Sequence, residues 1–362
     1  SSPAKRGGRS NGRTLTSGPY RRRAPPIRPR SRQRRWRRGL SVVAAAAVLT
    51  EPVMCNTGCI LPEPGYLQAM RELTERPFNL NFFSHMPPEP DAAREATWRQ
   101  ALAPYYAELG VDQASIASGP GRLPFNAEAA ELVEEFRPSV VSFHFGLPDE
   151  TLLQRVRRSG AKILSSATTL DEALWLQERG VDAVIAQGLE AGGHRGHFLD
   201  DDLSRQLGTF ALLPQLIDAL DVPVIAAGGI SDARGVAAAM ALGAAGVQVG
   251  SAYLLCPEAT TSAIHRAALQ SPAARHTALT NLFSGRPARG IVNRLMRELG
   301  PLSAQAPAFP LATAAIAPLR TAAEAQGNGD FSPLWAGQNI ANCRPMPAAE
   351  LTRKLARGFA QG

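Results

Sequence analysis

Short apolar segments alternate with amphipathic segments over most of the chain. Six β-rich runs recur, namely FNLNFF (78–83), SVVSFHFG (139–146), KILSSAT (162–168), DAVIAQG (182–188), VPVIAAGGI (222–230) and AGVQVGSAYLL (245–255). Helix-like segments lie between them, several with apolar residues at three- and four-residue spacing, at 91–110, 148–160, 170–180 and 231–243. This alternation predicts a parallel β-sheet covered by helices, because strands buried on both faces need nearly continuous apolar residues.

Polar or glycine residues stand at the end of strand after strand. They include Asn81, His144, Gln187, Gly228, Gly229, Gln248 and Ser251. In a (β/α)8 barrel the active site collects at the carboxyl ends of the strands. An open doubly wound sheet would instead carry a G-x-G-x-x-G turn after its first strand, and no such motif follows an N-terminal strand here. We therefore expect an α/β fold of the (β/α)8 TIM-barrel class.

Two glycine turns close the last two predicted βα units. AAGGISDARG (226–235) ends a strand with two glycines and offers Ser231 or Asp232 as a helix N-cap, and GVQVGSAY (246–253) contains a second turn. Backbone N–H groups at such turns attract phosphate, and the loops after strands seven and eight are its usual place in this fold. Glycines also permit tight turns where no ligand binds. Two successive turns in this place nevertheless favour a bound phosphate.

The formal net charge of +8 is concentrated at one end of the chain. Residues 1–38 hold 14 of the 39 Lys and Arg residues and no Asp or Glu, which leaves 25 basic against 31 acidic residues in 39–362. Because acidic residues outnumber basic residues in 39–362, this part of the chain is not expected to bind nucleic acid. We assign residues 51–362 to one folded domain and residues 1–50 to a basic leader, disordered because it has few apolar residues.

Three interpretations of this leader stay open. An Arg-rich segment followed by the apolar run LSVVAAAAVL (40–49) is typical of an export or organelle signal, and the run is too short to span a bilayer. A basic segment is also typical of an arm that binds nucleic acid or an acidic membrane. The third interpretation is an incorrectly assigned start site or reading frame.

The four cysteines form no recognisable metal set. Cys55 and Cys59 are spaced C-x3-C without a second pair or a nearby histidine, and Cys256 and Cys343 stand alone. We interpret them as reduced thiols, which is typical of a cytoplasmic protein, and we expect neither a metal site nor a membrane span.

Five motifs follow one another in the second half of the chain. They are QGLEAGGHRG, IAAGGI, QVGSAYLLCPEA, TNLFSGRPARGIVNRLMREL and DFSPLWAGQ. In this order and spacing they resemble the FMN-dependent nitronate monooxygenases, formerly called 2-nitropropane dioxygenases, from about Arg76 onward. The resemblance implies a (β/α)8 barrel with a smaller, mainly helical region over its mouth, to which 85–135 and 285–345 would contribute. It also implies noncovalently bound FMN and oxidation of alkyl nitronates, such as propionate 3-nitronate, with O2.

The resemblance assigns roles to individual residues. His194 matches the catalytic base of the family, and an imidazole suits proton transfer because its unperturbed pKa lies near neutrality. A buried structural histidine is the alternative. The flavin-contacting positions of the family match Asn81, Gln187, Gly192, Gly193, Gly228, Gly229, Gln248, Val249, Gly250 and Ser251.

Other polar residues near these motifs are weaker candidates for contact with the substrate or with the catalytic groups. His144 ends a strand at the barrel mouth and is equally typical of a packed structural histidine. Arg286 and Arg289 would attract an anionic substrate, although bracing of a loop is the commoner use of such arginines. For Glu190 and His197 we expect a surface or loop-bracing role.

The N-terminal part departs from the family pattern. The family begins with a strand that ends in a motif like QAPM, and no such strand is readable here. We therefore expect the first βα unit to be missing or replaced, which would expose a sheet edge and open one wall of the cofactor site. Two alternative functions stay open, namely a catalytically dead barrel with a basic arm and an enoyl-reductase-like flavin barrel that uses NAD(P)H. The sequence leaves open whether the protein forms an oligomer.

Overall fold

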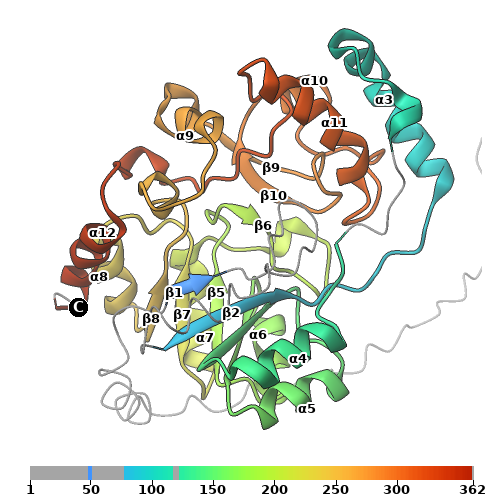
Figure 1. The fold of residues 1–362 in the computed structure, drawn as a ribbon. Coiled ribbons are helices and arrows are strands. Elements are labelled where there is room, and N and C mark those ends of the chain that lie inside the picture. The colour runs from blue at the N-terminus through green and yellow to red at the C-terminus, as the bar shows by residue number, and fades with distance from the viewer. Residues whose placement is uncertain (1–47, 51–76, 117–121, 361–362) are drawn as a thin grey trace, which may run out of the picture.

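A computed structural model describes residues 48–50, 77–116 and 122–360. Within these residues seven strands form one curled parallel sheet, in which each strand pairs with the next along the chain (Figure 1). The strands are β1 (Val48–Thr50), β2 (Phe78–Phe83), β3 (Val140–His144), β4 (Lys162–Ala167), β5 (Ala183–Gln187), β7 (Val224–Ala227) and β8 (Gly246–Gln248). Sequential parallel pairing is the order of a βα barrel. Within the described residues β1 and β8 are the two edges of the sheet.

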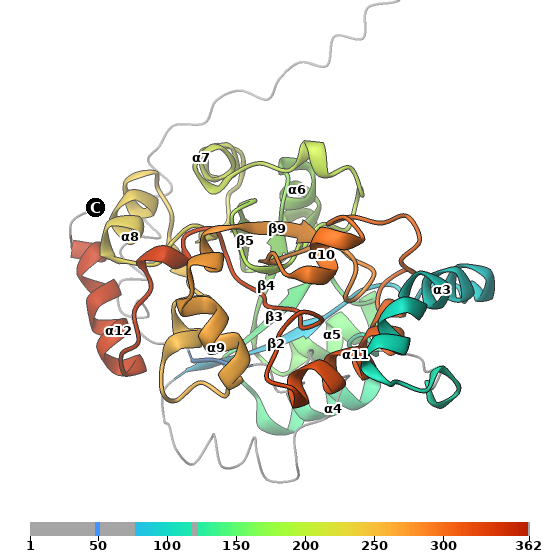
Figure 2. The same ribbon diagram turned by 90° about the horizontal axis from the view of Figure 1, so that it is seen from above.

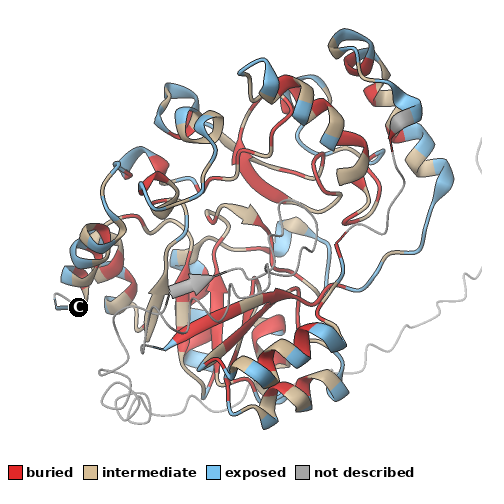
Figure 3. Ribbon diagram, in the orientation of Figure 1, coloured by how far each residue is buried: buried red, intermediate tan, exposed pale blue. Residues whose placement is uncertain are grey.

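Helices follow the strands and cover the outer face of the sheet. They are α4 (Ala127–Phe136), α5 (Glu150–Arg158), α6 (Leu170–Glu178), α7 (Thr209–Ala219) and α8 (Ala233–Ala241). Figure 3 shows that burial is concentrated in the strands and on the inner faces of these helices. Leu80, Val141, Val184 and Leu216 are fully buried members of this core. The predicted alternation of strands and helices is confirmed.

Short polar side chains begin four of these five helices, namely α4, α5, α6 and α8. Asp149 accepts a hydrogen bond from the backbone N–H of Leu152 at the start of α5, and Thr169 caps α6 in the same way. Asp232 caps α8 and accepts from the N–H of Gly235 at 3.0 Å. Each cap satisfies a backbone donor that a helix start leaves without a partner. Of the two residues predicted to cap α8, Asp232 does so.

Five of the six predicted strands form at their predicted places, but the last prediction is too long. Residues 245–255 contain the three-residue strand β8, then a turn and the 3₁₀ turn η3 (Tyr253–Leu255). The backbone N–H of Tyr253 bonds the carbonyl of Gly250 at 2.9 Å. This turn ends the extended conformation and leaves room for a loop at the carboxyl end of the sheet.

The first position of the sheet is held by β1. It pairs in parallel with β2, with Val48 opposite Phe78 and Thr50 opposite Leu80. The strand therefore consists of the last two residues of the apolar run 40–49 and of Thr50, all within the segment that was predicted to be a disordered leader. Residues 1–47, which carry the basic charge of the leader, lie outside the described residues.

A smaller region packs over the carboxyl ends of the strands. Its antiparallel sheet has the order β6 (Gly193–His194), β10 (Ala288–Ile291), β9 (Thr277–Thr280). Helices α3 (Ala92–Leu109) and α11 (Ala312–Ala325) lie side by side (Figure 2) and share a core that includes Trp98, Leu102 and Leu319. The remaining elements are η1 (Gln113–Ser115), η2 (Leu203–Arg205), α9 (Ala263–Gln270), η4 (Pro272–Arg275), α10 (Arg294–Glu298), η5 (Ile340–Asn342), α12 (Ala348–Ala356) and η6 (Arg357–Ala360).

The range 85–135 does not lie wholly in this smaller region. It contains α3 but also most of α4, which packs against α5 and the barrel core. No helix among the described residues is long and apolar enough to cross a membrane.

The contact between α3 and α11 includes one buried hydrogen bond, which gives a direct test of this packing. The hydroxyl of Tyr106 donates to the carbonyl of Ala315 at 2.7 Å. We expect Tyr106→Phe to lower the free energy of unfolding by about 1 kcal/mol, because the substitution removes a buried hydrogen bond without creating a large cavity. Urea unfolding would measure this loss. An unchanged midpoint would show that the bond does not stabilise the packing of the two helices.

Candidate active site

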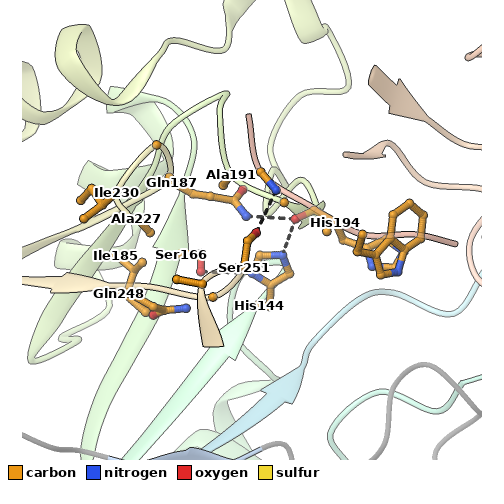
Figure 4. A pocket seen from close by; sticks show the side chains of 18 of the residues that line it. His144, Ser166, Ile185, Gln187, Ala191, His194, Ala227, Ile230, Gln248 and Ser251 are labelled. Atoms are coloured by element: carbon orange, nitrogen blue, oxygen red, sulfur yellow. Dashed lines mark hydrogen bonds between the residues drawn. The ribbon is translucent and has the colours of Figure 1, made fainter. Parts of the chain in front are cut away.

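A cavity of about 260 Å³ lies at the carboxyl ends of the barrel strands (Figure 4). Residues from β2, β3, β4, β5, β7 and β8 line it together with the loop that contains β6 and with the segment 335–343. The structure brings together there most of the residues predicted from the motifs, namely Asn81, His144, Gln187, Gly192, Gly193, His194, Gly228, Gly229, Gln248, Gly250 and Ser251. Val249, Arg286 and Arg289 do not line this cavity.

The turn after β5 is held by the side chain of Gln187. Its amide nitrogen donates to the carbonyl of His194 at 3.0 Å, and its amide oxygen accepts from the N–H of Gly196 at 2.8 Å. One side chain thus joins the end of a barrel strand to the carbonyl of His194 and to the N–H of Gly196, two residues further on. The side chain predicted to contact a cofactor therefore also fixes the position of the histidine.

Arg195 reinforces the same turn from the protein interior. Its side chain is fully buried, and its guanidinium donates to Gln206 Oε1 at 2.7 Å and to the carbonyls of Gly188 and Gln187 at 2.8 and 2.9 Å. Burial lowers the pKa of Arg195 to about 10, so the group stays charged at neutral pH. A buried cation that is bonded to carbonyl oxygens is costly to displace. The turn that carries His194 is therefore rigid.

The imidazole of His194 is surrounded by three aromatic rings, two of which, Phe83 and Trp335, line the cavity. The ring centroids of Phe309, Trp335 and Phe83 lie 5.2, 5.5 and 6.0 Å from its own centroid. Nε2 is 2.8 Å from the hydroxyl of Ser284. Within the described residues Nδ1 of His194 forms no hydrogen bond. This nitrogen is accessible from the cavity.

The surroundings of His194 keep its ring neutral. Burial is the main cause that lowers its pKa well below the usual value, and the positive charges of Arg122 and Arg286 act in the same direction. When Nε2 carries the proton, it donates to Ser284, whose hydroxyl faces the carbonyl of Arg286 at 3.4 Å. The lone pair is then on Nδ1. The site therefore presents a neutral imidazole that is able to accept a proton.

His144 lies on the cavity wall and supports His194. Its Nε2 is 3.0 Å from the carbonyl of His194, which only accepts hydrogen bonds, so this nitrogen carries the proton. Nδ1 of His144 then accepts from the hydroxyl of Ser166 at 3.1 Å. Burial lowers the pKa of His144 to about 3, in agreement with a single neutral tautomer. The residue combines the two roles considered for it, because it lines the cavity and holds the backbone of His194.

The glycine turns leave space and hydrogen-bond donors along the cavity. A Cβ atom at Gly250 would meet no atom of the described residues within 4 Å, whereas one at Gly192 would lie 2.5 Å from the backbone nitrogen of Gly337. Gly229 has φ of +73°, a conformation that favours glycine. The backbone N–H groups of Gly229 and Gly250 donate to no other group among the described residues. The two turns therefore form a cradle of available donors.

Sequence motifs did not reveal several residues of the cavity. The Ser231 side chain is buried, and its hydroxyl has no hydrogen-bond partner among the described residues. Asn339 donates to the carbonyl of Gly229 at 2.7 Å and so fixes the first glycine turn. Arg122 enters from the segment before α4. The glycine turn 226–235 could have indicated Ser231, but nothing in the sequence placed Asn339 or Arg122 at the barrel mouth.

Arg286 and Arg289 brace loops in this structure. Arg289 is buried and donates to the carbonyls of Leu189 and Thr277 at 2.9 and 3.3 Å. Arg286 donates to the carbonyl of His197, and its guanidinium lies 4.3 Å from the ring centre of Phe145. These contacts match the loop-bracing role that was one of the two interpretations for the arginines.

Glu190 and His197 also hold loops. The carboxylate of Glu190 accepts from the N–H of Thr209 at 2.8 Å and from its hydroxyl at 3.0 Å, at the start of α7. His197 is buried, with Nε2 at 3.3 Å from the exposed carboxylate of Asp201. Burial lowers the pKa of His197 to about 3, so we interpret this contact as one made by a neutral ring and not as an ion pair.

The lining of the cavity contains no Asp or Glu among the described residues, and Arg122 is its only Lys or Arg. The described part of the chain also contains no group of three or more His, Cys, Asp or Glu side chains placed to hold a metal ion. Cys256 and Cys343 are free thiols, whereas Cys55 and Cys59 lie outside the described residues.

A curled parallel sheet, a polar cavity at its carboxyl edge and a rigidly held imidazole define an enzyme of the βα-barrel class. Comparisons with known proteins agree. Residues 39–358 match the sequence model of a family described as nitronate monooxygenase, so the match begins well before Arg76. A nitronate monooxygenase of Pseudomonas aeruginosa is 44% identical over 298 residues, which cover 80% of this chain and 83% of that protein. A nitronate monooxygenase of Paraburkholderia phytofirmans is 41% identical over 342 residues, which cover 89% and 90%.

Solved structures show the same fold. A nitroalkane oxidase from Streptomyces ansochromogenes has a TM-score of 0.74 and 39% sequence identity, and the match covers 82% of this chain and 84% of that one. FabK from Thermotoga maritima has a TM-score of 0.60 at 21% identity, with 90% and 96% covered, and this likeness shows the fold alone. The chain therefore belongs to the nitronate monooxygenase family. It is an oxidoreductase of a flavin-dependent family, and the comparisons do not favour the enoyl-reductase-like alternative.

The neutral buried histidines generate a prediction about stability and pH. Burial lowers the pKa of His85 to about 4 and that of His197 to about 3. Between these values and the ordinary value near 6.5 the unfolded chain binds protons that the folded chain does not bind. We therefore expect the free energy of unfolding to fall as pH falls from about 6.5 to about 4, by up to ~1.4 kcal/mol per pH unit for each histidine.

Urea unfolding at several pH values would measure this slope. His197→Gln should flatten the slope, because the substitution removes a group that only the unfolded state protonates. His276→Gln, at an exposed position, is the matched control for a His-to-Gln substitution. Equal slopes for wild type and His197→Gln would contradict the assignment of a neutral buried ring.

Proposed function

We propose that this chain oxidises alkyl nitronates, of which propionate 3-nitronate is the type, with FMN as cofactor, O2 as oxidant and His194 as catalytic base. The observation that carries the proposal is the free Nδ1 of His194 on the wall of a cavity rich in hydrogen-bond donors. Membership of the nitronate monooxygenase family supports the substrate class.

The phosphate end of FMN fits the two glycine turns. The unpartnered hydroxyl of Ser231 and the available N–H groups of Gly229 and Gly250 are the donors that a phosphate requires. The open space in front of Gly250 would admit the phosphate close to the backbone. These residues together with Ser251 would hold this end of the cofactor.

Amide side chains are suited to the edge of the flavin ring, where hydrogen-bond donors and acceptors alternate. Asn81 accepts from the hydroxyl of Ser142 at 2.8 Å, which fixes its orientation and leaves its amide N–H groups available. Gln248 lines the cavity without a side-chain hydrogen bond among the described residues. We therefore assign ring recognition to Asn81, Gln187 and Gln248. When bound, FMN supplies the electron acceptor for the nitronate and the route of the electrons to O2.

His194 acts on the proton at the α-carbon of a neutral nitroalkane. Its Nδ1 carries the lone pair, and Ser284 fixes the tautomer by accepting from Nε2. The protonated ring that results would pair with the nitronate anion, whose negative charge offsets the burial that disfavours a charged imidazole. The aromatic rings around His194 exclude water from this proton transfer.

Replacement of the base tests this assignment. We expect His194→Asn to lower kcat/KM for nitroethane by about 10²- to 10⁴-fold, which is the usual loss when a general base is removed. Oxidation of preformed ethylnitronate should decline far less, because that substrate has already lost its proton. Oxygen consumption would give both rates, and the FMN content of the variant should equal that of wild type. The exposed His276→Gln is the matched control. Equal losses with both substrates would exclude the base role.

The phosphate cradle is tested by filling it. We expect Gly250→Val to prevent FMN binding while the protein stays folded, because the added Cβ would meet no atom of the described residues and the side chain would occupy the space for the phosphate. Gly246→Val is the matched control, since its Cβ likewise meets no atom in the described part of the chain and Gly246 lies outside the cavity. Absorbance of bound flavin and thermal unfolding would separate the two effects. Normal FMN affinity in Gly250→Val would place the phosphate elsewhere.

A further inference from the structure

Three polar side chains of the barrel form a chain of hydrogen bonds that leads to the active-site cavity. They are Asn79 and Asn81 of β2 and Ser142 of β3, and Asn81 lies opposite Ser142 in the register of the two strands. Successive side chains of a strand point to opposite faces, so Asn79 and Asn81 share one face, whereas Leu80 between them packs in the core. Asn81 lines the cavity. Asn79 and Ser142 are buried, with 5% and 1% exposed, and do not line it.

The hydrogen bonds of this chain have a direction. The amide nitrogen of Asn79 donates to the hydroxyl of Ser142 at 2.8 Å, and that hydroxyl donates to the amide oxygen of Asn81, also at 2.8 Å. A serine hydroxyl has a single proton, and because Asn79 is a donor this proton is left for Asn81. The oxygen of Asn81 is thereby occupied, and its NH2 group is left for the cavity. We call these three residues the amide relay.

Burial favours this direction over the reverse one. If both amides of the relay were turned over, the NH2 of Asn79 would take the place of its Oδ1, which has no hydrogen-bond partner among the described residues. Buried N–H donors without a partner are rarer in proteins than incompletely paired carbonyl oxygens, and an NH2 group has two such donors. Asn79 therefore sets the direction of the relay from a position outside the cavity.

We propose that Asn79 and Ser142 are positioning residues that hold Asn81 with its NH2 toward the bound cofactor, so that the flavin ring meets a donor and not an acceptor at this point. This inference rests on the proposed function, in which Asn81 contacts that ring. Reduction adds negative charge to a flavin, and hydrogen bonds to a charged acceptor are the stronger ones. The amide relay therefore strengthens flavin binding and raises the reduction potential of the flavin.

The test measures binding of riboflavin to the apoprotein, because riboflavin has the ring of FMN without the phosphate and its binding does not depend on turnover. We expect Ser142→Ala to weaken this binding by about 3- to 10-fold, the usual effect of one neutral hydrogen bond. In an Asn81→Ala background the same substitution should change the affinity by less than about 2-fold, since Ser142 acts through Asn81. Quenching of riboflavin fluorescence would give each affinity.

Further variants separate the direction of the relay from its packing. Asn81→Asp still accepts from Ser142 but has no NH2, so it should bind riboflavin as weakly as Asn81→Ala. Ser165→Ala on β4 is the matched control, because Ser165 is buried and its hydroxyl donates to backbone carbonyls. The reduction potential of bound FMN should fall in Ser142→Ala and stay unchanged in Ser165→Ala. Asn79→Leu removes the donor that sets the direction, and it carries the test if Ser142→Ala does not fold.

The outcomes separate this inference from the proposed function. If wild type oxidises nitronates, but Ser142→Ala leaves riboflavin affinity and potential unchanged or weakens binding equally in both backgrounds, the relay is overturned and the proposed function stands. Full riboflavin affinity in Asn81→Asp would show that the ring meets an acceptor, which also overturns the relay. If riboflavin binding depends on Ser142 only when Asn81 is present, but no nitronate is oxidised, the relay is supported and the proposed function fails. Absence of flavin binding by wild type would overturn both.

Discussion

The hydrogen bonds of the Gln187 side chain are the constraint on which the active site depends. This amide joins the end of β5 to the backbone of His194 and Gly196, while the buried Arg195 bonds the carbonyls at the start of the same turn. Gly192 lets this turn pass close to the segment around Gly337, and Gly193 adopts a φ of +74° that favours glycine. A catalytic imidazole must keep its position to a fraction of an ångström, and a turn with its polar groups satisfied in this way supplies that rigidity.

The electrostatics of the cavity follow from the same burial. His144 and His194 remain neutral because their rings are removed from water, and Arg122 stands near them as a permanent cation. Each positive charge in the region lowers the pKa of the imidazoles further. The site is therefore most complementary to an anion, which agrees with the negative charges of nitronates and of a cofactor phosphate.

Much of the barrel could be predicted from the chain because its strands are local and strongly patterned. Runs such as 78–83 and 182–188 are apolar enough to be buried on both faces, and polar residues at their ends indicated where the cavity would lie. The prediction at 245–255 was too long because the apolar pattern continues through a turn and into η3. Hydrophobicity alone does not distinguish a buried strand from a buried 3₁₀ turn.

The sequence by itself determined the fold class, the two glycine turns and the motif that contains His194, since each is a short contiguous pattern with its own physical requirement. Only the tertiary structure decided which side chains surround that motif. Arg122, Ser284, Phe309 and Asn339 come from segments far apart in the chain, and no local periodicity relates them to the barrel strands. Tertiary structure also assigned Arg286 and Arg289 to loop bracing, because hydrogen-bond partners depend on the packing of distant segments and not on the neighbouring residues.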